Sequence, residues 1–366
     1  MDAAPSHLPS ASDFVAALAR APLPAMIANL DAELATVSTG NVTLPISVSG
    51  GQPTCYICCP TVAYIDYARA ELRHFTRSPA LLRALDTLLR VAHPLVRASG
   101  LDRQVQAYNW LLATNPMPTL SRESLDGLTA QMSARWPGHA IIWRSLNDLT
   151  DTDMIRIFRA AGYQLLPARQ IYLYDCRNET PRLGRDGARD LELLDDGRFE
   201  IVAPAAIRLD DMARIAELYR QLYLDKYTWL NPQYSADFMR AMHFARLIRF
   251  HGLRGADGSF AGVVGLFESG DVVTAPIVGY DTSMAAETGL YRRLMALAMR
   301  RAREALMLFN MSAGAAAFKR NRGGVAAIEY SAVYDRGLRV DQRAAGAIMR
   351  GLLTTIGVPL LRRYEL

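Results

Sequence analysis

The sequence is almost without lysine. Of its 41 basic residues, only Lys226 and Lys319 are lysine, and the others are all arginine. A coding bias toward GC-rich codons would replace lysine wherever arginine serves, but the two side chains differ in shape, hydration and ability to lose a proton. We therefore regard the two surviving lysines as candidates for positions where arginine does not serve.

Long apolar runs and a basic leader are also missing. No uninterrupted apolar run reaches the length of about 18 residues that suggests a membrane-spanning helix. The segment Met1–Ser12 is small and polar, with Asp2 where a signal peptide would carry positive charge. We therefore expect a cytoplasmic protein with no membrane partner.

Cysteine and histidine are too sparse to indicate a disulfide framework or a metal site. Three of the four cysteines (Cys55, Cys58 and Cys59) lie in one apolar run, Thr54–Cys59. A second pair of metal ligands is missing, so we interpret this run as a buried core strand. The histidines show neither paired metal spacing nor a Ser/His/Asp order, and we expect no metal site and no hydrolase triad.

Length and charge leave room for two domains and an anionic ligand. The 366 residues exceed one ordinary domain. The net charge of +5 is too small to indicate nucleic-acid binding by itself, but it is compatible with an anionic ligand.

An internal repeat divides the chain. The spacing from Phe158 to Asp175 equals the spacing from Phe318 to Asp335, so both anchors recur at one constant offset. Before each phenylalanine the pattern predicts a helix, a short apolar strand and a second helix, at 124–135, 140–145 and 153–161 in the first half and at 290–305, 306–311 and 314–320 in the second. We predict an α/β fold with a mixed sheet, duplicated as residues 1–180 and 198–366 and joined by a charged linker at 177–198.

The second half has a recognisable order of elements. Its patterns predict two helices, three strands, a helix, a strand, a short helix and a final strand, at 209–223, 235–247, 249–254, 260–267, 272–280, 290–305, 306–311, 314–320 and 328–334. In the first half, Tyr108–Leu112 is predicted to be a strand that ends in polar residues.

This order resembles the GNAT superfamily of acyltransferases, over residues 201 to about 335. Two such units in tandem resemble the Fem-type aminoacyl-tRNA-dependent transferases and related two-domain N-acyltransferases. The stretch Ser312–Gly324 is similar to a Ser-Gly-x-x-x-Phe-Lys-x-x-x-Gly sequence of that group, with Ala313 where the group has serine.

The resemblance implies a place for an acyl donor. In the superfamily, the donor lies in a wedge between two diverging strands. The N-terminus of the next helix points at the diphosphate of the donor, because unpaired N–H groups and the helix dipole favour negative charge there. The donor-binding candidates are therefore Thr288, Gly289, Arg292, Arg293 and Lys319. Only Gly289 matches the superfamily's glycine pattern, and the bulky Tyr291 stands at its second small position. Acyl-CoA, an acyl-carrier protein and an aminoacyl-tRNA all remain open as the co-substrate, and no permanently bound cofactor is expected.

The candidates for catalysis are polar groups at strand ends near this wedge. Asp281 and Glu329 are candidate bases, and Tyr291, with Tyr280 and Tyr330, is a candidate acid for the leaving group. Asn310 and Ser312 end the strand on the far side of the wedge, where polar groups can meet a substrate.

A second group is the candidate acceptor site. It comprises Lys226, Tyr227, Trp229 and Asn231, which offer aromatic walls and polar handles near the predicted junction of the first two helices.

We conclude from the sequence that an N-acyltransferase acting on a small-molecule amine is the best hypothesis. The donor would be an acyl thioester, carried by CoA or a carrier protein, and the amine would attack it directly. One alternative is a Fem-like transfer from aminoacyl-tRNA, motivated by arginines from Arg292 to Arg322. A second is a GNAT-like protein that binds a ligand without catalysis.

Overall fold

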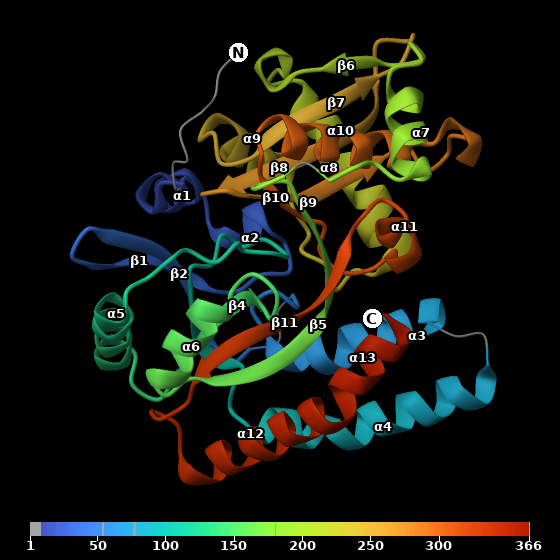
Figure 1. The fold of residues 1–366 in the computed structure, drawn as a ribbon. Helices are drawn as coiled ribbons and strands as arrows, with labels where there is room; N and C mark the ends of the chain where they lie inside the picture. The colour runs from blue at the N-terminus through green and yellow to red at the C-terminus, as the bar shows by residue number, and fades with distance from the viewer. Residues whose placement is uncertain (1–8, 53–54, 76–77, 180, 366) are drawn as a thin grey trace.

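The chain forms one mixed β-sheet with helices against both of its faces (Figure 1). The computed structural model describes residues 9–52, 55–75, 78–179 and 181–365. Across these ranges the sheet has 11 strands in the order β1-β2-β3-β4-β11-β5-β10-β9-β8-β7-β6. The α/β class predicted from the sequence is confirmed.

The strands of the two halves have the following bounds: β1 (Glu33–Thr39), β2 (Val42–Gly50), β3 (Arg103–Ala107), β4 (Ala140–Asn147), β5 (Gln164–Asp175), β6 (Glu200–Val202), β7 (Arg249–Arg254), β8 (Phe260–Ser269), β9 (Val272–Tyr280), β10 (Leu308–Asn310) and β11 (Val325–Tyr334).

The α-helices are α1 (Ala11–Leu18), α2 (Leu23–Met26), α3 (Ala68–Phe75), α4 (Pro79–Ala98), α5 (Arg122–Arg135), α6 (Thr152–Ala160), α7 (Arg185–Leu194), α8 (Asp211–Tyr219), α9 (Ala236–Phe244), α10 (Leu290–Glu304), α11 (Ala316–Arg320), α12 (Val340–Leu352) and α13 (Val358–Tyr364). Wider π-helical turns occur at η1 (Val62–Tyr67), η3 (Arg220–Tyr227) and η5 (Leu353–Gly357), and short 3-10 turns at η2 (Pro204–Ala206) and η4 (Ala286–Thr288).

The two halves of the chain are joined by exchanged strands. Strand β11 of the second half lies between β4 and β5 of the first half, and β5 in turn pairs with β10 of the second half. Figure 1 shows β11 and β5 running side by side through the middle of the molecule. The final strand was expected in a last hairpin of the second half, with Ile328–Tyr334 as one arm, and this expectation is wrong because β11 pairs with strands of the first half.

The repeat gives this exchange an approximate two-fold symmetry. In the antiparallel ladder between β5 and β11, Arg169 pairs with Glu329, and these two positions are separated by the same offset as the repeat anchors Phe158 and Phe318. A position and its own repeat equivalent thus face each other, so the local two-fold axis passes through this pair. On either side of the shared ladder lies one parallel pair, β3 with β4 and β9 with β10. The duplication predicted from spacing is present in the strand order.

Three local predictions are wrong. Residues 55–59 form a turn rather than a strand, although Cys55, Cys58 and Cys59 are buried as expected; Thr54 lies outside the described residues. The turn is held by polar contacts, since the Cys59 thiol and the Thr61 amide both donate to the Asp102 carboxylate.

Residues 108–112 are a loop rather than a strand, with Tyr108 and Leu111 at positive φ. The segment 177–198, predicted to be a linker or hairpin, contains helix α7. Several acidic residues of this segment bind arginines of α10, so its charge reflects ion pairing rather than exposure to solvent.

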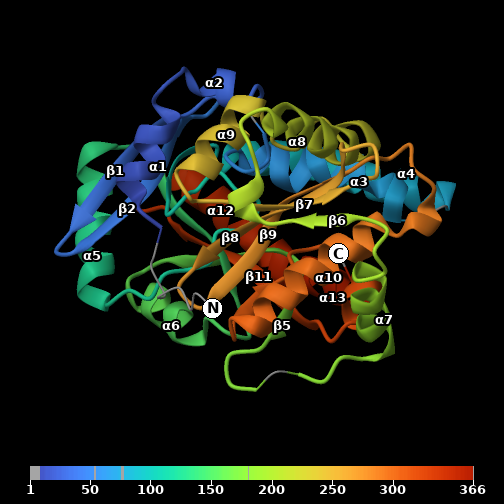
Figure 2. The same cartoon turned by 90° about the horizontal axis from the view of Figure 1, so that it is seen from above.

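Helices α8 and α10 cover opposite faces of strands β8 and β9 (Figure 2). A side chain at Gly279 of β9 would meet the Tyr219 amide nitrogen at 2.5 Å, whereas one at Gly262 of β8 would meet Leu294 of α10 at 3.2 Å. Only glycine at position 279 lets the backbone of α8 approach β9 this closely. The contact fixes where the following π-helical turn η3 begins.

The C-terminal helical segment differs from the others in composition. Among the described residues it is the one helix that is long and apolar enough to cross a membrane by length and composition, over Val340–Tyr364, with a mean hydropathy of 1.5 in its most apolar window. Only 6% of that window is buried in the protein.

Gly279→Ala is expected to destabilise the fold by about 1 to 3 kcal/mol, because the added methyl group overlaps backbone rather than a flexible side chain. Gly50→Ala is the matched control, since no atom lies within 4 Å of the methyl position and its φ is not positive. The free energy of unfolding in urea is the measurement. Equal values for the two variants would contradict the close approach of α8 to β9.

Candidate acyl-transfer site

A buried ion pair lies at the two-fold axis between the halves. Arg169 donates to both carboxylate oxygens of Glu329, at 2.8 and 3.2 Å, and Glu329 is 2% exposed. Burial disfavours the charged guanidinium, but the Glu329 carboxylate more than offsets this and leaves the pKa of Arg169 above its ordinary value. The pair is a rigid, charged link between β5 and β11.

Hydrogen bonds extend from this pair to the end of β10. Arg169 also donates to the Thr114 hydroxyl at 3.0 Å, and Thr114 donates to the Ser312 hydroxyl at 3.2 Å. Lys319 of α11 donates to the carbonyl oxygens of Ser312 and Ala313, at 3.1 and 2.7 Å. We call Glu329, Arg169, Thr114, Ser312 and Lys319 the central network.

Lys319 is the most strongly perturbed cation in this network. It is 3% exposed, and burial, together with the positive charge of Arg169, lowers the pKa of its ammonium group to about 7. Two of its protons are directed to the two carbonyl oxygens, and the remaining position carries a third proton or a lone pair. Lys319 can therefore gain and lose a proton near neutral pH.

The turn that receives Lys319 is conformationally strained. Ser312 and Ala315 both have positive φ, which costs about 1 to 3 kcal/mol for each non-glycine residue. The Asn310 side chain supports the turn by accepting a hydrogen bond from the Ser312 amide at 2.9 Å. The surrounding contacts thus hold two carbonyl oxygens in the positions that Lys319 requires.

The central network lies where two parallel strands separate. The ladder between β9 and β10 stops at Thr274 and Asn310, but β9 continues to Tyr280. Strand β9 therefore extends past the end of its partner beside the Ser312 turn. A substrate that binds as an extended chain would find a strand edge at this point.

Tyrosines surround the approach to this place. Tyr67 of η1 contacts Tyr56 with ring centroids 4.8 Å apart, and Tyr223 of η3 interacts electrostatically with Tyr56 and Arg169. Burial raises the pKa of all three phenols, so they stay protonated and can donate hydrogen bonds. The two π-helical turns η1 and η3, one from each half, thus bring phenol groups together.

The start of α10 is closed by α7. Arg293, 1% exposed, donates to the Thr288 carbonyl oxygen and to both carboxylate oxygens of Asp196. Gly289 precedes α10 with φ +64°, and Leu193 of α7 lies 2.8 Å from the position that a side chain there would take. Both the arginine and the glycine are engaged with α7.

Residues 183–320 match the family model described as "Acetyltransferase (GNAT) domain". The chain contains a GNAT domain. Its matched range spans α7 to α11 and includes the β9–β10 edge and Lys319, while Arg169, Thr114 and Glu329 lie outside it. The central network therefore joins the GNAT domain to β11 and to the first half of the chain.

Solved structures resemble the chain only remotely. They include L-PGS from Bacillus licheniformis (13% identity, 63% of this chain and 77% of that chain, TM-score 0.44) and FemX (9%, 63% and 80%, TM-score 0.47). A tandem GNAT protein from the clavulanic acid biosynthesis pathway matches over 90% of both chains at 11% identity and a TM-score of 0.37. The sequence matches none of the curated proteins.

The predicted catalytic residues divide into two groups. Glu329 and Ser312 belong to the central network, and Asn310 supports it. Asp281 instead binds Ser283 and Arg214, and these hydrogen bonds lower the pKa of its carboxyl group, which makes it a weak base.

Two of the tyrosines proposed as acids, Tyr291 and Tyr330, retain their protons because burial raises their pKa values. The ring centroid of Tyr291 lies 5.0 Å from that of Phe318 and 6.5 Å from that of Tyr280. Phe318 directly precedes Lys319 in the sequence. The phenols of Tyr291 and Tyr330 are therefore suited to donating hydrogen bonds rather than to releasing protons.

The predicted donor residues other than Lys319 have structural partners. Arg292 donates to the buried Asp190 carboxylate of α7 at 2.6 Å, and Arg322 binds the same carboxylate. The Thr288 hydroxyl donates to the Ala285 carbonyl oxygen within its own turn. These contacts fix α7, α10 and the end of α11 relative to one another.

The predicted acceptor residues lie on and after η3. Lys226 donates to the Tyr280 hydroxyl at 3.1 Å, and this hydrogen bond raises the pKa of Lys226. Tyr227 and Trp229 are exposed, whereas Asn231 is buried and donates to the Tyr223 and Thr228 carbonyl oxygens, which closes the loop. Lys226 and Tyr227 border the tyrosine group, while Asn231 shapes the loop behind it.

Arg169, Asp190 and Tyr67 of η1 were not predicted from the sequence, and Thr114 was predicted only as part of a polar strand end. One arginine among so many carries no compositional signal, and Thr114 acts through a loop whose course depends on the tertiary fold. The repeat did contain a signal for Arg169, because the repeat offset relates it to Glu329.

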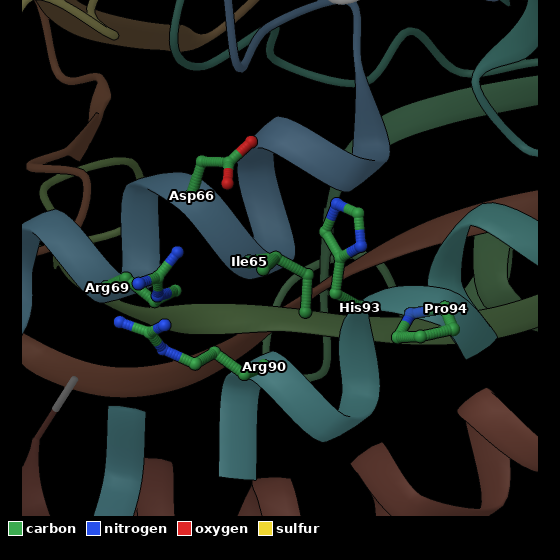
Figure 3. Close-up of a pocket in the computed structure, with 6 residues that line it drawn as sticks. All are labelled: Ile65, Asp66, Arg69, Arg90, His93 and Pro94. Carbon is green, nitrogen blue, oxygen red and sulfur yellow. The ribbon is translucent and has the colours of Figure 1, made fainter. Parts of the chain in front are cut away.

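A crevice lies apart from the central network, between η1, α3 and α4 (Figure 3). Within the described residues no group of three or more His, Cys, Asp or Glu side chains is arranged to hold a metal ion.

Because the chain has only two lysines, the protonation of Lys319 can be followed directly by NMR. Lysine labelled with carbon-13 at the ε position gives one NMR signal for each lysine, and Lys226→Arg assigns them. We expect the Lys319 signal to titrate with a midpoint at about 7 and the Lys226 signal to titrate above the ordinary range of lysine. Two signals that both titrate in the ordinary range would contradict the burial of Lys319.

Proposed function

We propose that this chain is an N-acyltransferase that transfers an acyl group from a thioester to an amine by direct attack, at the central network. The observation that carries the proposal is Lys319. This cation is buried where β10 ends beside the extended edge of β9, and its pKa lies near neutrality.

The reaction requires a group that stabilises negative charge and then supplies a proton. The amine nitrogen forms a bond to the acyl carbon, the carbonyl oxygen becomes an oxyanion, and the bond to the thiol sulfur then breaks. The attacking amine loses one proton, and the leaving thiol gains one. The third proton of Lys319 can donate a hydrogen bond to the oxyanion and then pass to the sulfur. The proton that the amine loses then restores the ammonium group of Lys319.

Glu329 and Arg169 position this centre in our proposal. Both carboxylate oxygens of Glu329 accept hydrogen bonds from Arg169, so we assign Glu329 to holding Arg169 rather than to contacting the amine. Arg169 holds Thr114, Thr114 holds Ser312, and the Ser312 carbonyl oxygen receives Lys319. The acceptor amine would approach along Tyr223, Tyr280 and Lys226.

The closed start of α10 bears on the choice of donor. Leu193 packs against Gly289, and Arg293 is fully engaged by Asp196 and the backbone. A donor with its diphosphate elsewhere, or with none, suits this arrangement better than one that needs the helix start. A thioester remains the first candidate: on a carrier protein it has no diphosphate, and on CoA its diphosphate would lie elsewhere. An aminoacyl ester on tRNA, which also lacks a diphosphate, remains the alternative.

We propose the cytoplasm as the place of action, because both kinds of donor are made there. The partners would be a small-molecule amine and an acyl donor, and the donor group would be carried by a carrier protein or by tRNA.

The donor test uses purified protein, an amine mixture and three donors labelled in the acyl group: acyl-CoA, acyl-carrier protein and aminoacyl-tRNA. We expect label transfer from a thioester that ribonuclease does not affect. Transfer only from aminoacyl-tRNA, with donor affinity that falls steeply with salt, would replace the thioester proposal by the alternative. A protein that binds none of the three would be a non-catalytic ligand-binding protein.

Lys319→Arg is expected to lower kcat by about 100-fold or more, because a guanidinium does not release its proton in this pH range. In the wild type, kcat should fall as the pH rises through about 7, since Lys319 then loses its third proton. The variant's residual activity should lack this alkaline decline. Arg320→Lys, on the next residue of α11 and 43% exposed, is the control and should leave kcat unchanged. Normal activity of Lys319→Arg would contradict the role of Lys319.

A further inference from the structure

The helices on one side of the molecule expose apolar side chains. Helices α4 and α12 pack against each other, and they form the lower layer in Figure 1 together with α13. We call α4, α12, η5 and α13 the outer layer. Its exposed apolar side chains, between 45% and 79% exposed, are Leu88, Val91, Val340, Ile348, Leu352 and Ile356.

These side chains follow helical spacing on the solvent side. Ile348, Leu352 and Ile356 stand at successive i, i+4 positions, so they form one stripe along the C-terminal helix. An adjoining strip of the same helix is already in use, since Ala345 and Met349 are buried, and Met349 packs with Val96 of α4. The exposed stripe is therefore additional to the core, and a contiguous apolar surface of this kind marks a docking site.

The outer layer also carries the positive charge of the chain. Residues 79–98 and 340–364 contain seven arginines against two aspartates, an excess of five positive charges. The whole chain has a net charge of +5, so the rest of the protein is neutral on balance. Apolar and cationic groups thus coincide on one layer.

A crevice at the edge of this layer is lined by basic side chains. It has a volume of about 260 Å³ and is lined by Ile65, Asp66, Arg69, Arg90, His93 and Pro94. Figure 3 shows Arg69 and Arg90 side by side, and Asp86 accepts from the Nε atom of each at 2.7 Å. Pro94 lies one helical turn from the exposed Val91, so the crevice adjoins the apolar surface.

We propose that the outer layer docks on an anionic lipid bilayer. The helix would lie along the bilayer surface rather than cross it, because crossing would remove Ala345 and Met349 from their packing. Apolar side chains on an exposed helix face enter the interface between headgroups and acyl chains, while flanking arginines bind anionic headgroups. The crevice beside Val91 would bring a lipid phosphate near Arg69 and Arg90, whose Nε atoms already bind Asp86.

The charge distribution favours a bilayer over a second copy of the chain. A symmetric dimer through this face would bring the arginines of both copies together with few carboxylates to balance them. An anionic bilayer supplies the opposite charge. The proposal does not depend on the transfer reaction, and it departs from the sequence expectation of no membrane partner.

The test is co-sedimentation of the full chain with vesicles of phosphatidylcholine, alone or mixed with phosphatidylglycerol. We expect binding to the mixed vesicles only. Arg343→Gln with Arg363→Gln should weaken that binding by about thirtyfold, since each surface arginine contributes about fivefold. Ile348→Asp with Ile356→Asp should abolish it.

The matched controls make the same changes elsewhere. Arg20→Gln with Arg135→Gln removes two exposed charges from outside the layer, and Leu209→Asp alters an exposed leucine at the start of α8. Both should bind as the wild type does, and thermal unfolding checks that every variant is folded.

Three results would overturn the proposal. They are no binding of the wild type to the mixed vesicles, equal losses in the layer variants and their controls, and a dimer in sedimentation velocity that Ile348→Asp with Ile356→Asp dissociates. The last result would assign the surface to a second copy.

Discussion

The bidentate contact between Arg169 and Glu329 is the interaction on which the rest of the structure depends. It lies where the two halves of the chain exchange strands, and it pairs a position with its own repeat equivalent. Breaking a buried pair by removing one partner costs about 3 to 5 kcal/mol, because the remaining charge stays buried. In this protein such a break would also release Thr114, and through it the Ser312 turn. Fold and candidate chemistry therefore share one electrostatic element.

The two halves are unequal although the fold is duplicated. In the first half, the backbone N–H of Asn115 donates to the Ser145 hydroxyl near the end of β4. A protein loop therefore fills the place beside the parallel pair β3–β4. In the second half, the adjacent Thr114 reaches Ser312 at the end of β10. Ser145 and Ser312 both have positive φ. One loop thus occupies its own half and supports the strand end of the other, while β9 beyond Thr274 is not paired with β10.

Much of the second half could be predicted from its sequence, because its helices and strands have clear apolar periods and turn residues. The exchange of β5 and β11 could not, since it depends on pairing between segments that lie in different halves of the chain. Residues 55–59 show a different limit: their apolar character indicated burial correctly, but contacts to Asp102 decided their conformation. At the candidate site, Glu329, Ser312 and Lys319 were named from the sequence. Arg169 was not, because arginine is common throughout the chain, although the same repeat offset relates it to Glu329.

The central claim is that the two halves form one functional unit built around the shared β5–β11 ladder. The most direct measurement is thermal unfolding of residues 198–366 expressed alone, followed by circular dichroism. The account predicts no cooperative transition, because β11 would lose both neighbouring strands and Glu329 would lose Arg169. Addition of residues 1–180 should restore the transition. A cooperative transition of residues 198–366 alone would contradict the account.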